Sequence, residues 1–303
     1  MKKEMKGSLL LLLTAIIWGA AFVAQSEGLH IVGPFTMQAV RFCLAGLVLI
    51  PVALLRDKTG KTTNKPVTPE DKRKLLIAGL VCGVCLFLAC STQMHGLQYP
   101  SVTAGKSGFL TALYVIMVPL VSVFLGKKLS FRIWIGVVLS VVGLYFLCLK
   151  DSLHLGKGEL LTLVCSVFFT FHILCVDRLT KDVDGVRFSA LQFFVTSALS
   201  AIGMFIWEKP DVSAILQCWL PICYAGICSG GIGYTLQIFG QQNTRPAIAS
   251  ILMSFEAVFA ALFGWVLIGQ ELSPRELLGC GIMFCAIIIA QLPGRQKTKV
   301  TEK

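Results

Sequence analysis

Ten apolar runs, each close to the length of a bilayer-spanning helix, restrict what this chain can fold into. A helix that crosses a bilayer needs about 20 mostly apolar residues. The connections are short, and the longest, residues 56–74, is a basic loop too short and polar to be a domain. The pattern predicts an all-α polytopic membrane protein with ten transmembrane helices. The runs cover residues 8–26, 33–55, 75–96, 103–125, 133–149, 159–179, 188–207, 215–240, 247–268 and 276–292.

Composition agrees with a protein whose main partner is the lipid bilayer. Only 14% of the residues are charged and 55% are hydrophobic, whereas soluble domains carry about 25% charged residues. The net charge of +11 does not indicate a nucleic-acid partner, because the basic residues form short runs between apolar segments. Most of the 12 cysteines lie in apolar runs, and Cys82 and Cys85 lack a second pair or a nearby histidine at ligand spacing. We therefore expect no metal and no cofactor.

The distribution of basic residues predicts the orientation in the membrane. If the N-terminus is cytoplasmic, 21 of the 27 Lys and Arg residues fall on the inner side and four on the outer side. The positive-inside rule then places both termini of a multi-pass cell-membrane protein in the cytoplasm. Lysines before the leucine run at residues 9–13 would also suit a signal peptide, but the internal repeat described next favours a retained helix.

The two halves of the chain repeat one another. A first alignment, without gaps, sets LGKKLSFRIWIG (125–136) against IGQELSPRELLG (268–279), and a second sets positions 7–10 against positions 158–161. The units are residues 7–149 and 156–292, each with five helices. Because five is odd, the second unit crosses the membrane in the opposite sense. Inverted repeats of this kind are typical of secondary transporters that work by alternating access.

The sequence also resembles a known family. The segment AIIWGAAFVA with Trp18-Gly19, and the segments LGKKLS and IGQELS after the fourth and ninth helices, are similar to the EamA-type members of the drug/metabolite transporter superfamily. The resemblance covers residues 7 to about 292, although the second unit has Phe169-Thr170 in place of Trp-Gly. It implies a ten-helix transporter with a cavity lined mainly by helices one, three, four, six, eight and nine. Members mostly export amino acids, metabolites or toxic organic compounds, so efflux of a small-molecule substrate is expected.

Other functions are less well supported. A polytopic membrane enzyme would need a chemical constellation, and the chain has no H-E-x-x-H, no paired aspartate motif at a helix end and no G-x-S-x-G. A non-transporting scaffold or sensor would be expected to add a soluble domain or a long tail. We therefore interpret the protein as a transporter and not an enzyme. Small-x-x-x-small patterns permit a homodimer.

Two ionisable residues within the runs are candidates for substrate binding or coupling. A charge at a helix centre costs roughly 2.5–3.5 kcal/mol and marks function by default. Lys106 stands in Gly105-Lys106-Ser107, which resembles the end of a phosphate-binding loop. Pro100 occupies the place of that loop's first glycine, however, and no strand precedes it. Lys106 could reach the outer surface or face the cavity.

Glu256 is the stronger candidate, because it lies ten residues past Pro246, about 15 Å along its helix and near the midplane. The first alignment of the two halves pairs Glu256 with Leu113 and Lys106 with Ala249, so each charge breaks the symmetry. A structural Lys106–Glu256 pair and a cavity site for a zwitterionic or charged substrate both remain open. A carboxylate near the midplane would also suit coupling to H⁺.

The remaining polar residues are weaker candidates. Arg41, which corresponds to Gln192 in the second alignment, is expected to snorkel or bond another helix more readily than to bind substrate. His95 and His172 are expected to be polar packing. Gly230, Gly231 and Gly233 in the eighth run predict tight helix packing, a hinge or unwound patch, or both together. An aromatic and hydrogen-bonding cavity wall is expected from Trp18, Gln93, Tyr114, Tyr234 and Gln237.

Overall fold

The computed structural model describes residues 2–102, 104–148, 156–268 and 273–291, and in these ranges the chain is all-α. Three ends of the apolar runs expected from the sequence, at Thr103, Leu149 and Leu292, lie outside the described residues. The helices of the first half are α1 (Lys2–Leu29), α2 (Pro34–Lys58), α3 (Pro69–Leu97), α4 (Ala104–Ala112), α5 (Tyr114–Phe124) and α6 (Phe131–Cys148). Those of the second half are α7 (Lys157–Leu179), α8 (Gly185–Trp207), α9 (Val212–Gln217), α10 (Trp219–Cys223), η1 (Tyr224–Tyr234), α11 (Thr235–Gln241), α12 (Pro246–Met253), α13 (Glu256–Ile268) and α14 (Pro274–Gln291).

Helix starts follow local sequence signals. Proline occupies the first turn of α2, α3 and α12, where its missing N–H needs no partner. Thr68 caps α3 in a reciprocal pair: its hydroxyl accepts from the Asp71 N–H, and the Asp71 carboxylate accepts from the Thr68 N–H, both at 3.1 Å. The Asp184 carboxylate caps α8 through the Arg187 N–H at 2.9 Å. These caps lie in or beside the short polar connections.

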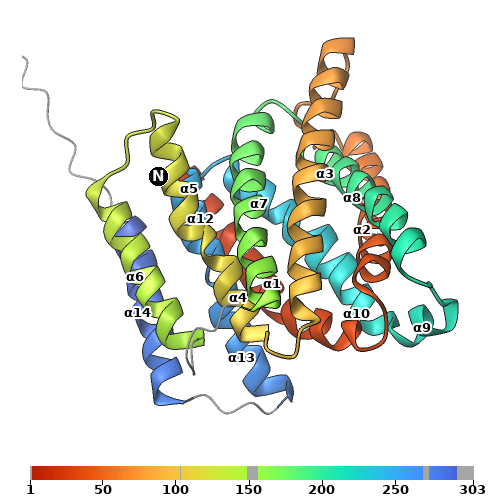
Figure 1. Ribbon diagram of the computed structural model, residues 1–303. Coiled ribbons are helices and arrows are strands. Elements are labelled where there is room, and N and C mark those ends of the chain that lie inside the picture. Colours follow the sequence, from red (N-terminus) through yellow and green to blue (C-terminus); the bar gives the residue numbers. More distant parts are fainter. Residues whose placement is uncertain (1, 103, 149–155, 269–272, 292–303) are drawn as a thin grey trace, which may run out of the picture.

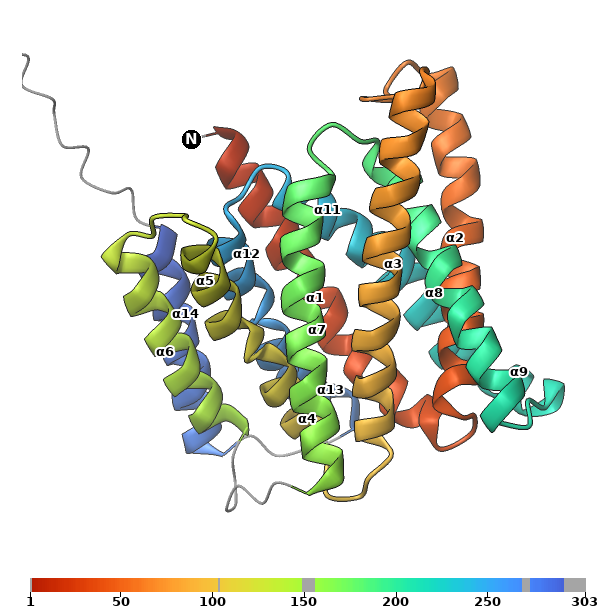
Figure 2. The same ribbon diagram turned by 45° about the horizontal axis from the view of Figure 1, so that its top comes forward.

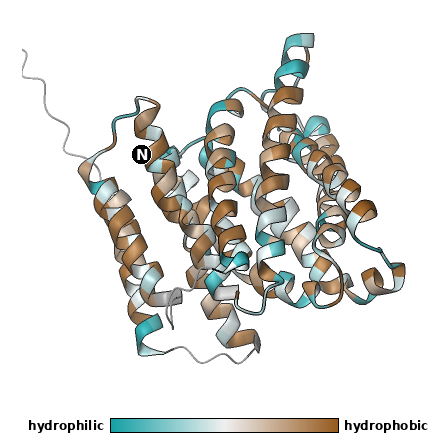
Figure 3. Ribbon diagram, in the orientation of Figure 1, coloured by the Kyte–Doolittle hydropathy of each residue, from teal (hydrophilic) through white to brown (hydrophobic). Residues whose placement is uncertain are grey.

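Eight helical segments of the described chain are long and apolar enough to cross a membrane. Two further helices, α6 and α14, pack against each other at one side of the bundle (Figures 1 and 2). In the segment formed by α12 and α13, 78% of the most apolar 18-residue stretch is buried, against 39% in α2. The segment α12–α13 therefore lies at the centre of the bundle and α2 at its periphery. Large apolar side chains such as Leu47, Phe205 and Val266 are exposed, and Figure 3 shows apolar residues along the helices. A surface of this kind suits contact with lipid.

The connections that carry basic residues lie together at one end of the molecule. In Figure 2 the N-terminus and the α2–α3, α5–α6 and α7–α8 connections lie at the same end of the molecule. These connections and the N-terminal segment carry most of the basic residues assigned above to the inner side. The helix α1 contacts α13, α11 and η1 along its length, so its apolar run is an integral part of the fold.

Three runs expected to be single α-helices are interrupted. The run at 103–125 breaks at Leu113 between α4 and α5, and the run at 247–268 breaks at Ser254 and Phe255 between α12 and α13. At both breaks the backbone makes tighter i→i−3 bonds, such as Phe255 N–H to Leu252 O at 3.3 Å. The run at 215–240 contains the π-helix η1. The first alignment pairs Leu113 with Glu256, so the first two breaks fall at nearly equivalent places.

One close glycine contact in the first half has an equivalent in the second half. A Cβ atom on Gly226 would lie 2.8 Å from the Arg41 carbonyl oxygen and 3.0 Å from Leu44. A Cβ atom on Gly83 would lie 3.0 Å from the Gln192 carbonyl oxygen and 2.7 Å from Val195. The first alignment pairs the two glycines, and the second pairs their partners. Each half thus presents one glycine to the same positions of the other half.

Candidate functional site

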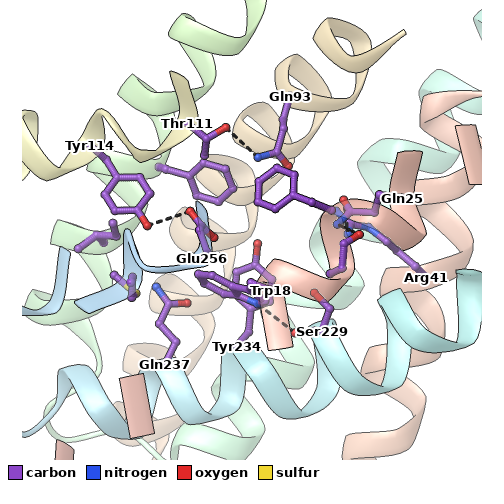
Figure 4. A pocket seen from close by; sticks show the side chains of 15 residues that line it. Trp18, Gln25, Arg41, Gln93, Thr111, Tyr114, Ser229, Tyr234, Gln237 and Glu256 are labelled. Atoms are coloured by element: carbon purple, nitrogen blue, oxygen red, sulfur yellow. Dashed lines mark hydrogen bonds between the residues drawn. The ribbon is translucent and has the colours of Figure 1, made fainter. Parts of the chain in front are cut away.

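A cavity lies where α1, α2, α3, η1 and the interrupted helices meet (Figure 4). It contains about 470 Å³ of empty space, including the open space at its mouth. The surrounding α7 contributes two apolar side chains. The lining residues are Trp18, Ala21, Phe22, Gln25, Arg41, Gln93, Thr111, Tyr114, Phe169, Ile173, Ser229, Tyr234, Gln237, Met253 and Glu256. The cavity therefore combines aromatic walls with amides, hydroxyls and two opposite charges.

Glu256 is the first residue of α13, directly after the break in that span. Its side chain is 4% exposed, and the Tyr114 hydroxyl donates to Oε1 at 2.9 Å. The N–H groups of a helix N-terminus favour a negative charge, so the break provides a position where a carboxylate can be buried. Among the described residues, no ion pair within 4.0 Å involves Glu256.

Arg41 also lines the cavity, on the α2 side. Its guanidinium donates to Gln25 Oε1 at 3.0 Å and lies 4.4 Å from the centre of the Phe42 ring. Because Arg41 is 3% exposed, the expectation that it snorkels to the surface is wrong, while the expected bond to another helix is present. In the part of the chain that the structure describes, no carboxylate lies within 4.0 Å of the guanidinium.

The aromatic wall is formed by Trp18 and Tyr234, whose ring centres lie 4.6 Å apart. Trp18 Nε1 donates to the Ser229 carbonyl oxygen of η1 at 3.3 Å. That carbonyl belongs to the π-helix, and π-helical turns are frequent at functional sites. The Tyr234 hydroxyl lies 3.8 Å from Cys90 Sγ. The expected aromatic wall is therefore assembled by contacts between α1, α3 and η1.

The side-chain amides of Gln93 and Gln237 both line the cavity, but they differ in the hydrogen bonds that they already make. Gln93 Nε2 donates to the Thr111 hydroxyl at 3.1 Å. Gln237 Nε2 donates to Gln241 Oε1 at 2.9 Å, and Gln237 Oε1 is buried with no hydrogen-bond partner among the described residues. The amide of Gln237 is thus held in place with an unused acceptor, beside Glu256 in Figure 4.

The glycines expected to form a hinge all lie in η1, but they differ in their surroundings. A Cβ atom on Gly230 would lie 2.8 Å from Ala45 Cβ, and one on Gly233 would lie 2.8 Å from Trp18 Nε1. A Cβ atom on Gly231 would meet no atom closer than 3.6 Å. Gly230 and Gly233 therefore permit close packing, and hinge motion at the three glycines stays a prediction.

Lys106, unlike the other charged candidate from the sequence, does not line the cavity. It lies in the first turn of α4, and its ammonium contacts Glu159 Oε1 of α7 at 2.6 Å. Glu159 is 2% exposed at its side chain and Lys106 is 19% exposed. The structure therefore does not form the Lys106–Glu256 pair that the sequence left open. Glu159 was missed because it stands at the end of an apolar run, where a solvated carboxylate is the ordinary expectation.

Other polar groups on these helices are engaged in packing. His172 Nε2 lies 3.0 Å from Gln192 Oε1, and His95 Nδ1 lies 2.7 Å from the Ser91 carbonyl oxygen. Within the described ranges, no group of three or more His, Cys, Asp or Glu side chains is arranged to hold a metal ion.

Comparisons with known proteins agree with this architecture. The EamA-like transporter family matches residues 5–149 and 156–291. An uncharacterized transporter of Archaeoglobus fulgidus is 28% identical over 96% of this chain and 87% of its own length. The threonine/homoserine exporter RhtA of Escherichia coli K12 is 26% identical, with 97% of this chain and 94% of that protein covered.

Two further comparisons extend the similarity. The S-adenosylmethionine/S-adenosylhomocysteine transporter of Chlamydia muridarum is 25% identical over 90% of this chain and 88% of its own length. One crystal structure has the same fold, with a TM-score of 0.76 at 22% identity over 94% of this chain and 96% of that chain. This chain belongs to the EamA-like transporter family and is a multi-pass membrane transporter of small solutes.

Proposed function

We propose that the protein is a secondary transporter that exports a small organic solute by alternating access through the cavity described above. The observation that carries the proposal is the position of that cavity. It lies at the two helix breaks and the π-helix, where backbone irregularity is tolerated because it lines a cavity and not lipid. Discontinuous helices around a central site are typical of transporters that expose the site to each side in turn.

We also propose that the ten helices form two inverted repeats, an arrangement that suits this mechanism. Trp18 and Phe22 of α1 correspond, in the second alignment, to Phe169 and Ile173 of α7, and all four line the cavity. Two repeats are also supported by the equivalent contacts of Gly83 and Gly226, and by the match of each half to the same family. A site formed by equivalent residues of two halves can face either side when one half tilts against the other.

Ion pairs join the two halves at both ends of the bundle. At the end that carries the basic loops, Arg187 of α8 contacts Asp57 of α2 at 2.7 Å. Lys127, after α5, contacts Asp177 of α7 at 2.8 Å at the same end. At the other end, Lys106 contacts Glu159. Exchange between inward-open and outward-open shapes requires contacts of this kind to break at one end while those at the other end hold.

Amino acids and their derivatives are the first solutes to test, because two relatives are named for threonine and homoserine and for S-adenosylmethionine. Metabolites in the medium of overexpressing and deletion cells would be compared, and each solute that tracks expression would be tested by counterflow in proteoliposomes. The proposal expects at least one such solute to exchange across the membrane through the purified protein. Absence of counterflow for every solute that tracks expression would contradict it.

The energy source is proposed to be an H⁺ gradient acting at Glu256. Removing a carboxylate from water favours its neutral form, and Glu256 is buried within the cavity. The Glu256→Gln variant is therefore expected to lose the pH dependence of transport in proteoliposomes. If the variant keeps the wild-type pH dependence, Glu256 is not the coupling group and another gradient drives the transporter.

A further inference from the structure

We propose that the cavity binds a small zwitterion, with its carboxylate at Arg41 and its ammonium group at Glu256. The inference rests on the proposed function in one respect, that this cavity is the site from which the solute is transported. It assigns a substrate class and separate roles to two residues that the fold places in one cavity. Either charge alone would favour a monovalent ion, but the two together favour a molecule that carries both signs.

Both ionisable groups are buried without an ionic partner among the described residues. Arg41 is 3% exposed and Glu256 is 4% exposed. Two other deeply buried carboxylates at helix ends, Glu159 and Asp184, each have an Arg or Lys within 4.0 Å. A buried charge that lacks a partner destabilises a protein strongly. Glu256 avoids this cost as the neutral acid when the cavity is empty, and we infer that a ligand ammonium group partners its ionised form while a ligand carboxylate partners Arg41.

An acceptor and a donor that have no partner among the described residues lie at different ends of the cavity. In Figure 4, Glu256 lies with Tyr114 and Gln237, whereas Arg41 lies with Gln25 on the far side of Trp18. Within the part of the chain that the structure describes, Gln237 Oε1 has no donor and Arg41 Nε has no acceptor. The Glu256 end therefore suits an ammonium group, which only donates, and the Arg41 end suits a carboxylate, which only accepts.

Aromatic rings stand between the two charges. The centre of the Tyr234 ring lies 4.6 Å from that of Trp18 and 6.3 Å from that of Phe42, and the Arg41 guanidinium lies 4.4 Å from the centre of the Phe42 ring. In Figure 4, Trp18 lies between Glu256 and Arg41. The two charges are thus separated by a wall of aromatic rings, against which a short carbon chain can pack. A guanidinium binds carboxylate through two parallel N–H bonds, and an ammonium group is also attracted to an indole face.

Solutes with one charge or none fit this arrangement less well. A monovalent cation would satisfy Glu256 but leave Arg41 unpaired and repelled, and a monovalent anion would do the converse. A neutral solute would displace water while leaving both charges without partners. Only a zwitterion offsets both burial penalties at once.

The test measures binding to wild-type protein in nanodiscs by titration calorimetry. The probes are glycine, β-alanine, 4-aminobutyrate and 5-aminopentanoate, whose charge separation grows by one carbon at each step, together with threonine and homoserine. Butylamine and butyrate each retain one charge of 4-aminobutyrate. We expect at least one zwitterion to bind about tenfold or more tightly than either singly charged compound, because each charge-assisted contact contributes more than a neutral one.

The chain length of the zwitterion that binds best then reports the distance between the two groups. If butylamine or butyrate binds as tightly as every zwitterion, the proposal is wrong. It is also wrong if no zwitterion binds at concentrations up to about 10 mM, which is beyond the affinity expected of a weak specific ligand. Both outcomes are read on wild-type protein and do not depend on whether a variant folds.

Two variants assign the ends of the ligand. Arg41→Gln carries the residue found at the corresponding Gln192, and we expect it to bind zwitterion and amine equally. Glu256→Gln is expected to bind zwitterion and carboxylate equally. Glu159→Gln is the matched control, a buried carboxylate outside the cavity, and should keep the wild-type preference. Loss of preference in the control alone would overturn the assignment.

Counterflow of the same zwitterions separates this inference from the proposed function. Selective binding without transport would contradict the transporter mechanism and leave the zwitterion site standing. Transport of a solute that shows no preference for two charges, and no dependence on Arg41, would sustain the transporter mechanism and overturn the zwitterion site.

Discussion

Two sets of buried charges in this protein are treated in opposite ways. Lys106 and Glu159 lie 2.6 Å apart and join α4 to α7, where each offsets the burial of the other. Arg41 and Glu256 share a cavity, yet neither has an ionic partner among the described residues. The position of a charge in an apolar run therefore does not by itself indicate a ligand site. What indicates a ligand site is whether the fold supplies the partner or leaves it to a ligand.

The two sets also differ in what surrounds them. The Lys106–Glu159 pair stands at the ends of two helices, where the lysine ammonium also donates to the Ser101 carbonyl oxygen at 3.2 Å. The cavity charges lie deep among Trp18, Tyr234 and the broken helices. The first arrangement suits a contact between the two halves, and the second suits recognition of a solute.

Removing a cavity charge should weaken ligand binding most. For Glu256→Gln and Arg41→Gln we expect about 100-fold weaker binding of the best zwitterion, as for loss of one charged hydrogen-bonded contact. Lys106→Met should bind it within about threefold of wild type. Titration in nanodiscs gives all three affinities. If Lys106→Met loses as much affinity as Glu256→Gln, the lysine binds the solute after all.

Stability should respond in the reverse order. Glu159→Gln removes one partner of a mostly buried pair and leaves the other charge, which we expect to lower the free energy of unfolding by about 2 kcal/mol, reduced from the fully buried case because Lys106 is partly exposed. Glu256→Gln removes a charge that has no ionic partner among the described residues and should leave the ligand-free stability unchanged or higher. Thermal and denaturant unfolding in detergent measures both. Equal losses in the two variants would remove the distinction between the paired Glu159 and the cavity residue Glu256.

Glycine substitutions in η1 test how closely the cavity wall is packed. Gly233→Ala would place a methyl group against Trp18 Nε1 and displace the ring, so we expect about tenfold weaker binding by loss of packing and of the bond to Ser229. Gly231→Ala is the matched control, because its Cβ atom meets nothing closer than 3.6 Å. Titration of the two variants should separate them clearly. Equal behaviour would indicate that η1 acts through its flexibility and not through contact with Trp18.

The smallest effect is expected from Tyr114→Phe. This change removes the hydrogen bond to Glu256 at 2.9 Å but keeps the ring and the charge. We expect about threefold weaker binding, since the carboxylate loses orientation and not its attraction for an ammonium group. Titration beside Glu256→Gln gives the comparison. A loss as large as that of Glu256→Gln would mean that Tyr114 contacts the solute directly.

Much of this cavity follows from residue type and repeat position. Glu256, Trp18, Gln93, Tyr114, Tyr234 and Gln237 were all expected at the site, and all line it. They were identifiable because polar and aromatic groups within apolar runs have few other favourable places. Arg41 was rated lower because the sequence does not show which way a long side chain turns on its helix.

The helix breaks could not be predicted because their sequences do not mark them. The segments around Leu113 and around Ser254-Phe255 hold neither proline nor glycine, the ordinary causes of such interruptions. The Lys106–Glu159 contact was equally hidden, since it depends on how α4 and α7 are rotated against each other. Local periodicity predicts a helix, whereas its interruption and its partner depend on tertiary packing.

The most direct test of the central claim is a structure of the protein with the tightest-binding zwitterion of the series. We predict one ligand in the cavity, with its carboxylate within hydrogen-bond distance of Arg41 and its ammonium group within that distance of Glu256. A ligand bound beside Lys106 and Glu159, or one in the cavity that contacts neither Arg41 nor Glu256, would contradict it.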